Sequence, residues 1–126
     1  MGTASGNLGC IISGFVSSAA ITALANTTLS SITLPVGVWS IVGTYTGTIP
    51  SAGYIIVSIN FGTGITAINR NACSTAFLNG GPQLASATVS TIICITATTI
   101  INFNCTPSVN ITTTNNIGQF YAVRIA

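Results

Sequence analysis

The sequence almost lacks ionisable side chains. Its 126 residues include no Asp, Glu or His, and Arg70 and Arg124 are the only basic residues. Soluble domains are about 25% charged, so roughly thirty charged residues would be ordinary at this length. Neutral polar groups must therefore form most of the solvent-exposed surface, and the chain has 20 Thr, 13 Ser and 11 Asn for this role.

The missing residue types exclude most kinds of catalysis, metal binding and nucleic-acid binding. General acid–base catalysis uses His, Asp, Glu or Lys, and a Ser or Thr nucleophile needs such a group beside it. Ca²⁺ and Mg²⁺ need carboxylate oxygens, and two Arg do not make the basic patch of a nucleic-acid binder. We therefore predict a protein that is not an enzyme, with no catalytic residues, no cofactor, no metal ion and no nucleic-acid partner.

Long apolar runs and a secretion signal are also missing. No stretch of 18 apolar residues occurs, and the N-terminus has no basic segment before an apolar one. We therefore expect neither membrane insertion nor a signal peptide. The chain is nevertheless 48% hydrophobic with a net charge of +2, so it should fold, and its copies should repel one another little. This balance predicts a protein that works in an assembly.

The four cysteines have no His to complete a zinc site and no CxxC spacing. Cys94 and Cys105 are the nearest pair in sequence and form the candidate disulfide. The alternative is that all four are free thiols that pack as small hydrophobic residues. Asn-x-Thr sequons at Asn26, Asn104 and Asn110 are interpreted as unmodified polar residues, because such triplets arise by chance in a chain this rich in Asn and Thr.

The residues that are abundant favour β-structure. Ile, Thr and Val make up 47 positions, and apolar residues recur with a period of two. The predicted inward sets are listed by segment: Trp39, Ile41 and Tyr45; Ile55, Val57, Ile59 and Phe61; Val89, Ile93 and Ile95; Ile101, Phe103 and Cys105; Val109 and Ile111.

Turn signals separate these runs, for example Leu34–Gly37, Thr48–Gly53 and Asn79–Pro82. Two weaker strands are expected at Gly14–Ala25 and Thr27–Leu34. Eight to ten short strands with turns every 8–12 residues are typical of an antiparallel β-sandwich or jelly roll. We predict one such domain over residues 1–126, with residues 1–14 as a candidate N-terminal arm.

Two surface regions are candidate contact sites. The final strand, Gln119–Ile125, is predicted to face the core with Tyr121, Val123 and Ile125. This orientation would put Phe120 and Arg124 outside, and such residues are enriched at interfaces. A subunit interface is therefore predicted at Phe120 and Arg124, with Tyr121 beside them; a plain solvated face is the alternative. The segment Asn69–Ser86 shows no clear alternation and is predicted to be an exposed loop, with Arg70, Asn71 and Phe77 as candidate receptor contacts.

A family resemblance adds to this prediction. Leu34–Gly43 has the form L-P-x-G-x-W-x-I-x-G, and Tyr121–Ala126 has the form x-A-x-R-I-A. Together with the β runs at Ala85–Thr96 and Ile100–Asn104, they resemble TNF/C1q-like jelly rolls found on virions. Those proteins are capsid-associated proteins of large DNA viruses and the tips of phage head or tail fibres.

The resemblance covers roughly Ser30 to Ala126, and it implies a trimeric jelly roll whose C-terminal strand lies near the threefold axis. We therefore predict a structural virion protein, located on the virion, whose partners are its own copies in a homotrimer and other capsid or fibre proteins. Three alternatives stay open: a fibre-tip module that binds a host-surface glycan or receptor, a TNF/C1q-like secreted ligand, and an ice-binding surface suggested by the Thr-x-Thr pieces.

Overall fold

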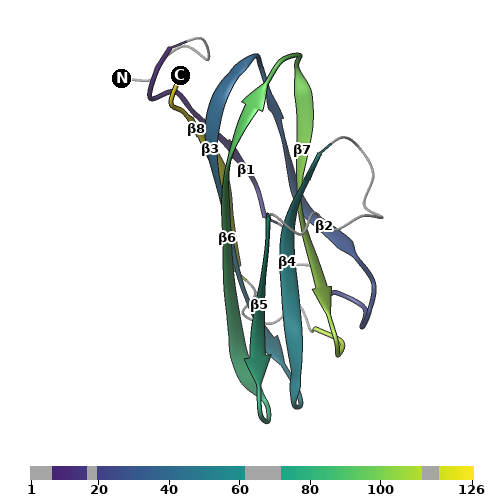
Figure 1. The fold of residues 1–126 in the computed structure, drawn as a ribbon. Helices are drawn as coiled ribbons and strands as arrows, with labels where there is room; N and C mark the ends of the chain where they lie inside the picture. The colour runs from purple at the N-terminus through teal and green to yellow at the C-terminus, as the bar shows by residue number, and fades with distance from the viewer. Residues whose placement is uncertain (1–6, 17–19, 62–71, 112–116) are drawn as a thin grey trace.

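The part of the chain that the structure describes folds into eight β-strands. The computed structural model describes residues 7–16, 20–61, 72–111 and 117–126, and no helix of these residues is long and apolar enough to cross a membrane. The strands are β1 (Ile11–Gly14), β2 (Thr27–Leu34), β3 (Gly37–Ile49), β4 (Gly53–Phe61), β5 (Cys73–Leu78), β6 (Gln83–Ile95), β7 (Thr99–Pro107) and β8 (Ile117–Arg124). They form two four-stranded antiparallel sheets stacked as a sandwich (Figure 1). The predicted antiparallel β-sandwich is confirmed.

The strand order alternates between early and late segments of the chain. One sheet, called the β8 sheet here, has the order β1-β8-β3-β6. The other, called the β4 sheet, has the order β2-β7-β4-β5. β8 therefore lies between β1 and β3, although these three strands are far apart in sequence. β6 and β3 pair without interruption over 13 residues each, which makes them the longest ladder of the molecule.

The period-two pattern correctly predicts most of the core. Trp39, Ile41 and Tyr45 of β3 are fully buried, and so are the predicted inward residues Ile55, Val57 and Ile59 of β4 and Ile101, Phe103 and Cys105 of β7. Alternation works here because the residues between the core residues are mostly polar, even where they are buried as well, as Ser58 and Asn60 of β4 are. Phe61 is an exception, since it is the last residue of β4 and is exposed.

Two segment predictions are wrong. β1 covers Ile11–Gly14, the last residues of the candidate arm, and forms an edge strand. Within the described part of the predicted strand at Gly14–Ala25, residues 15, 16 and 20–25 form no strand, and only Ile21 makes an isolated bridge, to Ile111. The predicted loop at Asn69–Ser86 contains β5 and the start of β6. The alternation of apolar residues did not reveal β5, because β5 is an edge strand whose largest residue, Phe77, points outward.

The two sheets are joined through a pair of aromatic rings. Phe103 of β7 and Phe120 of β8 stack with ring centroids 5.3 Å apart and an interplanar angle of 20°. Gly43 of β3 provides the space for this stack, because a Cβ at that position would lie 2.5 Å from Cε1 of Phe103. No carbon contact between side chains is that short, so a larger residue would push the ring out of place.

Gly43→Ala is expected to lower the free energy of unfolding by about 1–3 kcal/mol through this overpacking. Equilibrium urea unfolding measures it. Gly80→Ala is the control, since a Cβ there meets nothing within 4 Å, and its effect should stay within about 0.5 kcal/mol. Adding Phe103→Leu to Gly43→Ala should restore part of the loss as a non-additive coupling. Equal stability of the two glycine variants would contradict this packing role for Gly43.

Candidate functional site

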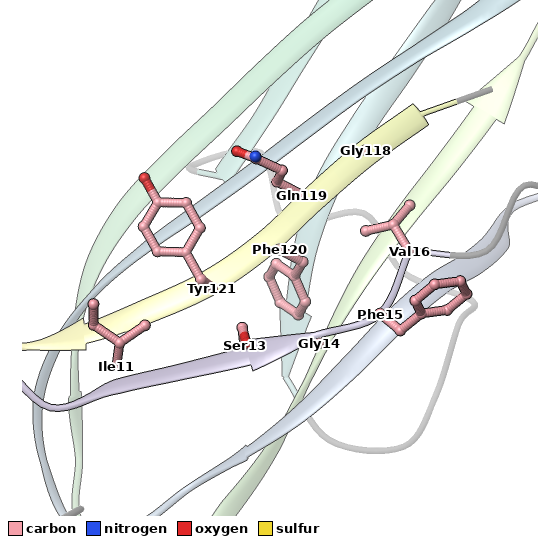
Figure 2. A pocket seen from close by; sticks show the side chains of 9 residues that line it. All are labelled: Ile11, Ser13, Gly14, Phe15, Val16, Gly118, Gln119, Phe120 and Tyr121. Carbon is pink, nitrogen blue, oxygen red and sulfur yellow. The ribbon is translucent and has the colours of Figure 1, made fainter. Parts of the chain in front are cut away.

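A groove runs between β1 and β8. β1 pairs with the second half of β8 only, from Gly14 opposite Phe120 to Ile11 opposite Val123. Residues 118 and 119 of β8 therefore have no described strand on this side, and a hollow of about 460 Å³ opens there (Figure 2). The groove exists because β1 is short and the chain leaves β8 after Gly14.

The lining of the groove is apolar and neutral polar. Ile11, Phe15 and Val16 provide aliphatic and aromatic walls on the β1 side. Gln119 and Tyr121 project from β8 and bring an amide and a phenol (Figure 2). Phe15 has 87% of its surface exposed, which leaves a large ring available for contact. The groove can therefore accept an uncharged partner surface.

A second hollow of about 210 Å³ continues the groove across β8 onto β3. It shares Gly118 and Gln119 with the first hollow and adds Thr44, Thr46 and Ile117. The Thr44 and Thr88 hydroxyls lie 3.2 Å apart across β3 and β6, and the Thr46 hydroxyl donates to Ser86 Oγ at 2.9 Å. This hydroxyl ladder occupies one half of the outer face of the β8 sheet.

The other half of that face mixes apolar side chains with the serines Ser40 and Ser90. Tyr121 lies opposite Val42 across β8 and β3, and Val123 lies opposite Ile11 of β1. Ile92 of β6 is 64% exposed at the same end of the sheet. Over the described residues of these four strands, no charged side chain points outward. Exposed apolar residues interspersed with hydroxyls and free of outward charge make this face a candidate interaction site.

Sequence reasoning missed most of this face. The signal was present in Thr44-Tyr45-Thr46-Gly47-Thr48, where three Thr alternate with small or inward residues and so share one side of a strand. Gln119 carried no such signal. Ser86 and Thr88 lie far from Thr44 in sequence, so only the pairing of β3 with β6 brings the hydroxyls together.

The predicted interface trio is divided by the structure. The orientation of the last strand was wrong: Phe120 and Ala122 face the core, and Phe120 is only 1% exposed. Phe120 therefore cannot be an outer contact residue. Tyr121 does lie on the outer face, in the groove. The physical reason is that both sides of this strand are apolar, so the stacking partner Phe103 decides which side is buried.

Arg124 occupies the corner of the sandwich next to the C-terminus. Its guanidinium carbon lies 5.9 Å from the centroid of the Trp39 ring, and its Nη1 donates to the Val36 carbonyl at 2.8 Å. The Trp39 indole N–H in turn donates to the Pro35 carbonyl at 3.0 Å. Trp39 is fully buried, as predicted. These contacts fix the turn between β2 and β3 against the last strand, which is a structural role for Arg124.

The candidate receptor residues do not form one loop. Arg70 and Asn71 lie outside the described residues. Phe77 belongs to β5, where it is 75% exposed on the outer face of the β4 sheet. Its cross-strand neighbour is Tyr54, with ring centroids 6.0 Å apart.

The candidate Cys94–Cys105 disulfide is not formed; Cys10 and Cys105 are buried thiols, as the alternative expects, whereas Cys73 and Cys94 are exposed. Cys94 is exposed on β6 of the β8 sheet, whereas Cys105 of β7 points into the core from the β4 sheet. Burial raises the pKa of the Cys105 thiol to about 12, because the thiolate would lose its hydration. Burial, and secondarily the nearby Cys105, also raises the pKa of Tyr45.

Asn104 is fully buried, and its side-chain oxygen and nitrogen have no hydrogen-bond partner among the described atoms. Its sequon is therefore inaccessible to a glycosyl group in the folded chain.

Among the described residues no three Cys lie close enough to hold a metal ion. No known family model matches the chain, and a search of curated proteins found no match.

The raised pKa of Cys105 predicts alkaline sensitivity. Below about pH 8 the thiol is protonated in both the folded and the unfolded chain, so it leaves stability unchanged. Between about pH 8 and 12 the unfolded chain releases a proton that the folded chain keeps, so stability falls as pH rises. The loss should reach about 1.4 kcal/mol at pH 10.

With no Asp, Glu or His in the chain, the free energy of unfolding should also be nearly constant between about pH 4.5 and 7.5. Urea unfolding at several pH values in the presence of a reductant tests both statements. Cys105→Ala should remove the decline that begins near pH 8 and leave the later one above about pH 10 that Tyr45 contributes, while Cys94→Ala, which removes an exposed thiol, should keep both. An acid transition near pH 5 would contradict the expectation.

Thiol labelling separates the cysteines. Cys73 and Cys94 are exposed and should react with a disulfide reagent such as DTNB within minutes at pH 8. Cys10 and Cys105 are buried and should react only after guanidinium unfolding. Two fast and two slow thiols are expected; four fast thiols in the native protein would contradict the burial of Cys105.

Proposed function

We propose that this chain is a non-enzymatic structural component of a virion, a jelly roll that assembles with its own copies as a homotrimer. The observation that carries the proposal is the outer face of the β8 sheet, which combines a groove, exposed apolar residues and hydroxyls with no outward charge over its described residues. Assembly through this face gives the chain a function that needs no reactive side chain.

The strand pairing supports the jelly-roll part of the proposal. β1 pairs with β8, β2 with β7, β3 with β6 and β4 with β5, which is a set of nested antiparallel pairs. A long hairpin of paired strands that rolls up on itself produces this nesting. The rolling also accounts for the cross pairs of β3 with β8 and β4 with β7. Jelly rolls of eight strands in two sheets occur in viral capsid proteins.

The size of the face supports a subunit contact. Strands of 4, 8, 13 and 13 residues cover roughly 600 Å² in projection, at about 3.4 Å per residue and 4.8 Å per strand. Protruding side chains enlarge this area, and stable interfaces bury about 800 Å² per partner. The face is therefore large enough for one of the two contacts that each subunit of a trimer makes.

The charge balance supports self-association. Two copies of a chain with a net charge of +2 repel weakly, and the outward residues of the contact carry no charge that burial would have to desolvate. β8 lies inside its sheet, between β1 and β3, and this agrees with the central C-terminal strand that the TNF/C1q resemblance implies. Assembly by apolar contact should also depend little on salt.

Native mass spectrometry of the purified chain at micromolar concentration should give a trimer in place of the 12.7 kDa monomer. Ile92→Asp and Tyr121→Asp each bury an uncompensated charge in the proposed contact and should shift the population to monomer, by at least about tenfold in the dissociation constant.

Thr75→Asp adds the same charge on β5, outside the proposed contact, and should leave the trimer intact. Circular dichroism confirms that each variant is folded, and Ile92 serves as the safer position because it is largely exposed. A wild-type monomer, or a trimer equally resistant to all three charges, would refute assembly through the β8 sheet.

A further inference from the structure

The outer face of the β4 sheet carries an exposed aromatic pair that the proposed assembly does not use. Phe77 of β5 and Tyr54 of β4 are direct cross-strand partners, with ring centroids 6.0 Å apart and an interplanar angle of 56°. Phe77 is 75% exposed, while Tyr54 is half-buried beneath it. Because the two sheets of a sandwich point their outer faces in opposite directions, this pair stays accessible when copies meet through the β8 sheet.

We propose that Tyr54 and Phe77 form a binding platform for a neutral sugar. A hexose ring offers an apolar face of C–H groups, which packs on an aromatic ring, and a rim of hydroxyls, which needs neutral donors and acceptors. The platform offers both, since Thr75 lies two residues before Phe77 on the same side of β5 and is exposed. Ile56, opposite Thr75 on β4, extends the apolar floor.

The platform is held rigidly. The backbone N–H of Tyr54 donates to Ser108 Oγ at 2.8 Å, and the Ser108 N–H donates back to the Tyr54 carbonyl at 2.9 Å. The backbone of Tyr54 is thus fixed by Ser108, just after the end of β7, and the Phe77 ring packs against the Tyr54 ring. A pre-organised surface loses little conformational entropy on binding, which matters for a ligand that makes few contacts.

The size of the platform favours a sugar over a protein partner. Three-quarters of a Phe side chain is roughly 150 Å², which suits the face of one or two sugar rings. A protein partner would need about 800 Å² per side. Apart from Ile56, the outward residues next to the pair are hydroxylic, such as Thr106 of β7 and Ser108 just after it, so the apolar patch ends at Ile56.

Charge and position favour a neutral ligand at an outer tip. Arg124 is the only charged side chain among the described residues, and it lies at the C-terminal corner. β5 ends at the opposite tip of the molecule from the C-terminus (Figure 1). Phe77 lies near that tip, because it is the last residue but one of β5, roughly 13 Å along the strand from Cys73 at its start. An ionised sugar would find no described counter-charge at the platform.

The test is an NMR titration of the ¹⁵N-labelled full chain with lactose, N-acetylglucosamine and methyl glucoside. We expect saturable shifts of the amides of Tyr54, Thr75 and Phe77 for at least one of these probes, with a dissociation constant of about 1–10 mM, as befits few contacts. Phe77→Ala should weaken binding at least tenfold, and Phe77→Trp should retain it. Ile92→Ala removes a similarly exposed residue from the other sheet and should change nothing.

Four results would overturn the proposal: no shifts with any probe up to 100 mM, shifts unaffected by Phe77→Ala, tighter binding of 3′-sialyllactose than of lactose, or loss of the oligomer in Phe77→Ala. The last result would assign the pair to a protein contact. Since Ile92→Asp and Tyr121→Asp test assembly on the opposite sheet, the sugar platform and the proposed assembly can fail separately.

Discussion

The burial of one apolar face of each sheet against the other is the interaction on which the rest of this molecule depends. Phe103 and Phe120 stack across the two sheets, and Gly43 leaves the space they need. Once this contact is made, the opposite side of every strand must face outward, because successive side chains alternate. The outer face of the β8 sheet and the Tyr54–Phe77 pair are both consequences of that choice.

A near absence of charge shapes both outer faces. Without carboxylates or amines, hydroxyl and amide groups must satisfy one another across strands, as Thr46 does with Ser86 and Ser31 with Asn102. Such pairs hold no net charge to repel a second copy, and they do not titrate near neutral pH. Because charged side chains are so few, the chain has few groups that could bind an ionic ligand selectively. Recognition by this chain is therefore expected to rest on shape, apolar contact and neutral hydrogen bonds.

The two outer faces differ in a way that suits different partners. The outer face of the β8 sheet combines the long β3–β6 ladder with a groove and several exposed apolar residues, and this extended surface favours a large, flat partner such as another copy. The β4 sheet is mostly polar outside and concentrates its exposed aromatic surface in one pair near a tip. A small ligand matches such a patch better than a protein surface does. A sandwich can therefore keep assembly and recognition on separate sheets.

Local alternation predicted the strands whose two faces differ strongly in polarity. Trp39, Ile41 and Tyr45 are interleaved with Ser, Val, Gly and Thr, and they lie in the core as expected. The same logic failed for β8, where Phe120 and Tyr121 are both aromatic and neither face is marked as inner. It failed for β5 as well, because an edge strand buries little and its one large residue is outside.

The sequence by itself determined that the chain is a β-protein without Asp, Glu, His or Lys side chains, since composition and period-two alternation are local properties of the chain. Only the tertiary structure decided which face of β8 is buried, that Cys94 and Cys105 lie on different sheets, and that β1 stops short of the start of β8 and opens the groove. These features depend on which strands become neighbours. That choice rests on contacts between residues far apart in sequence, such as Phe103 with Phe120 and Gly43, and no local pattern encodes such contacts.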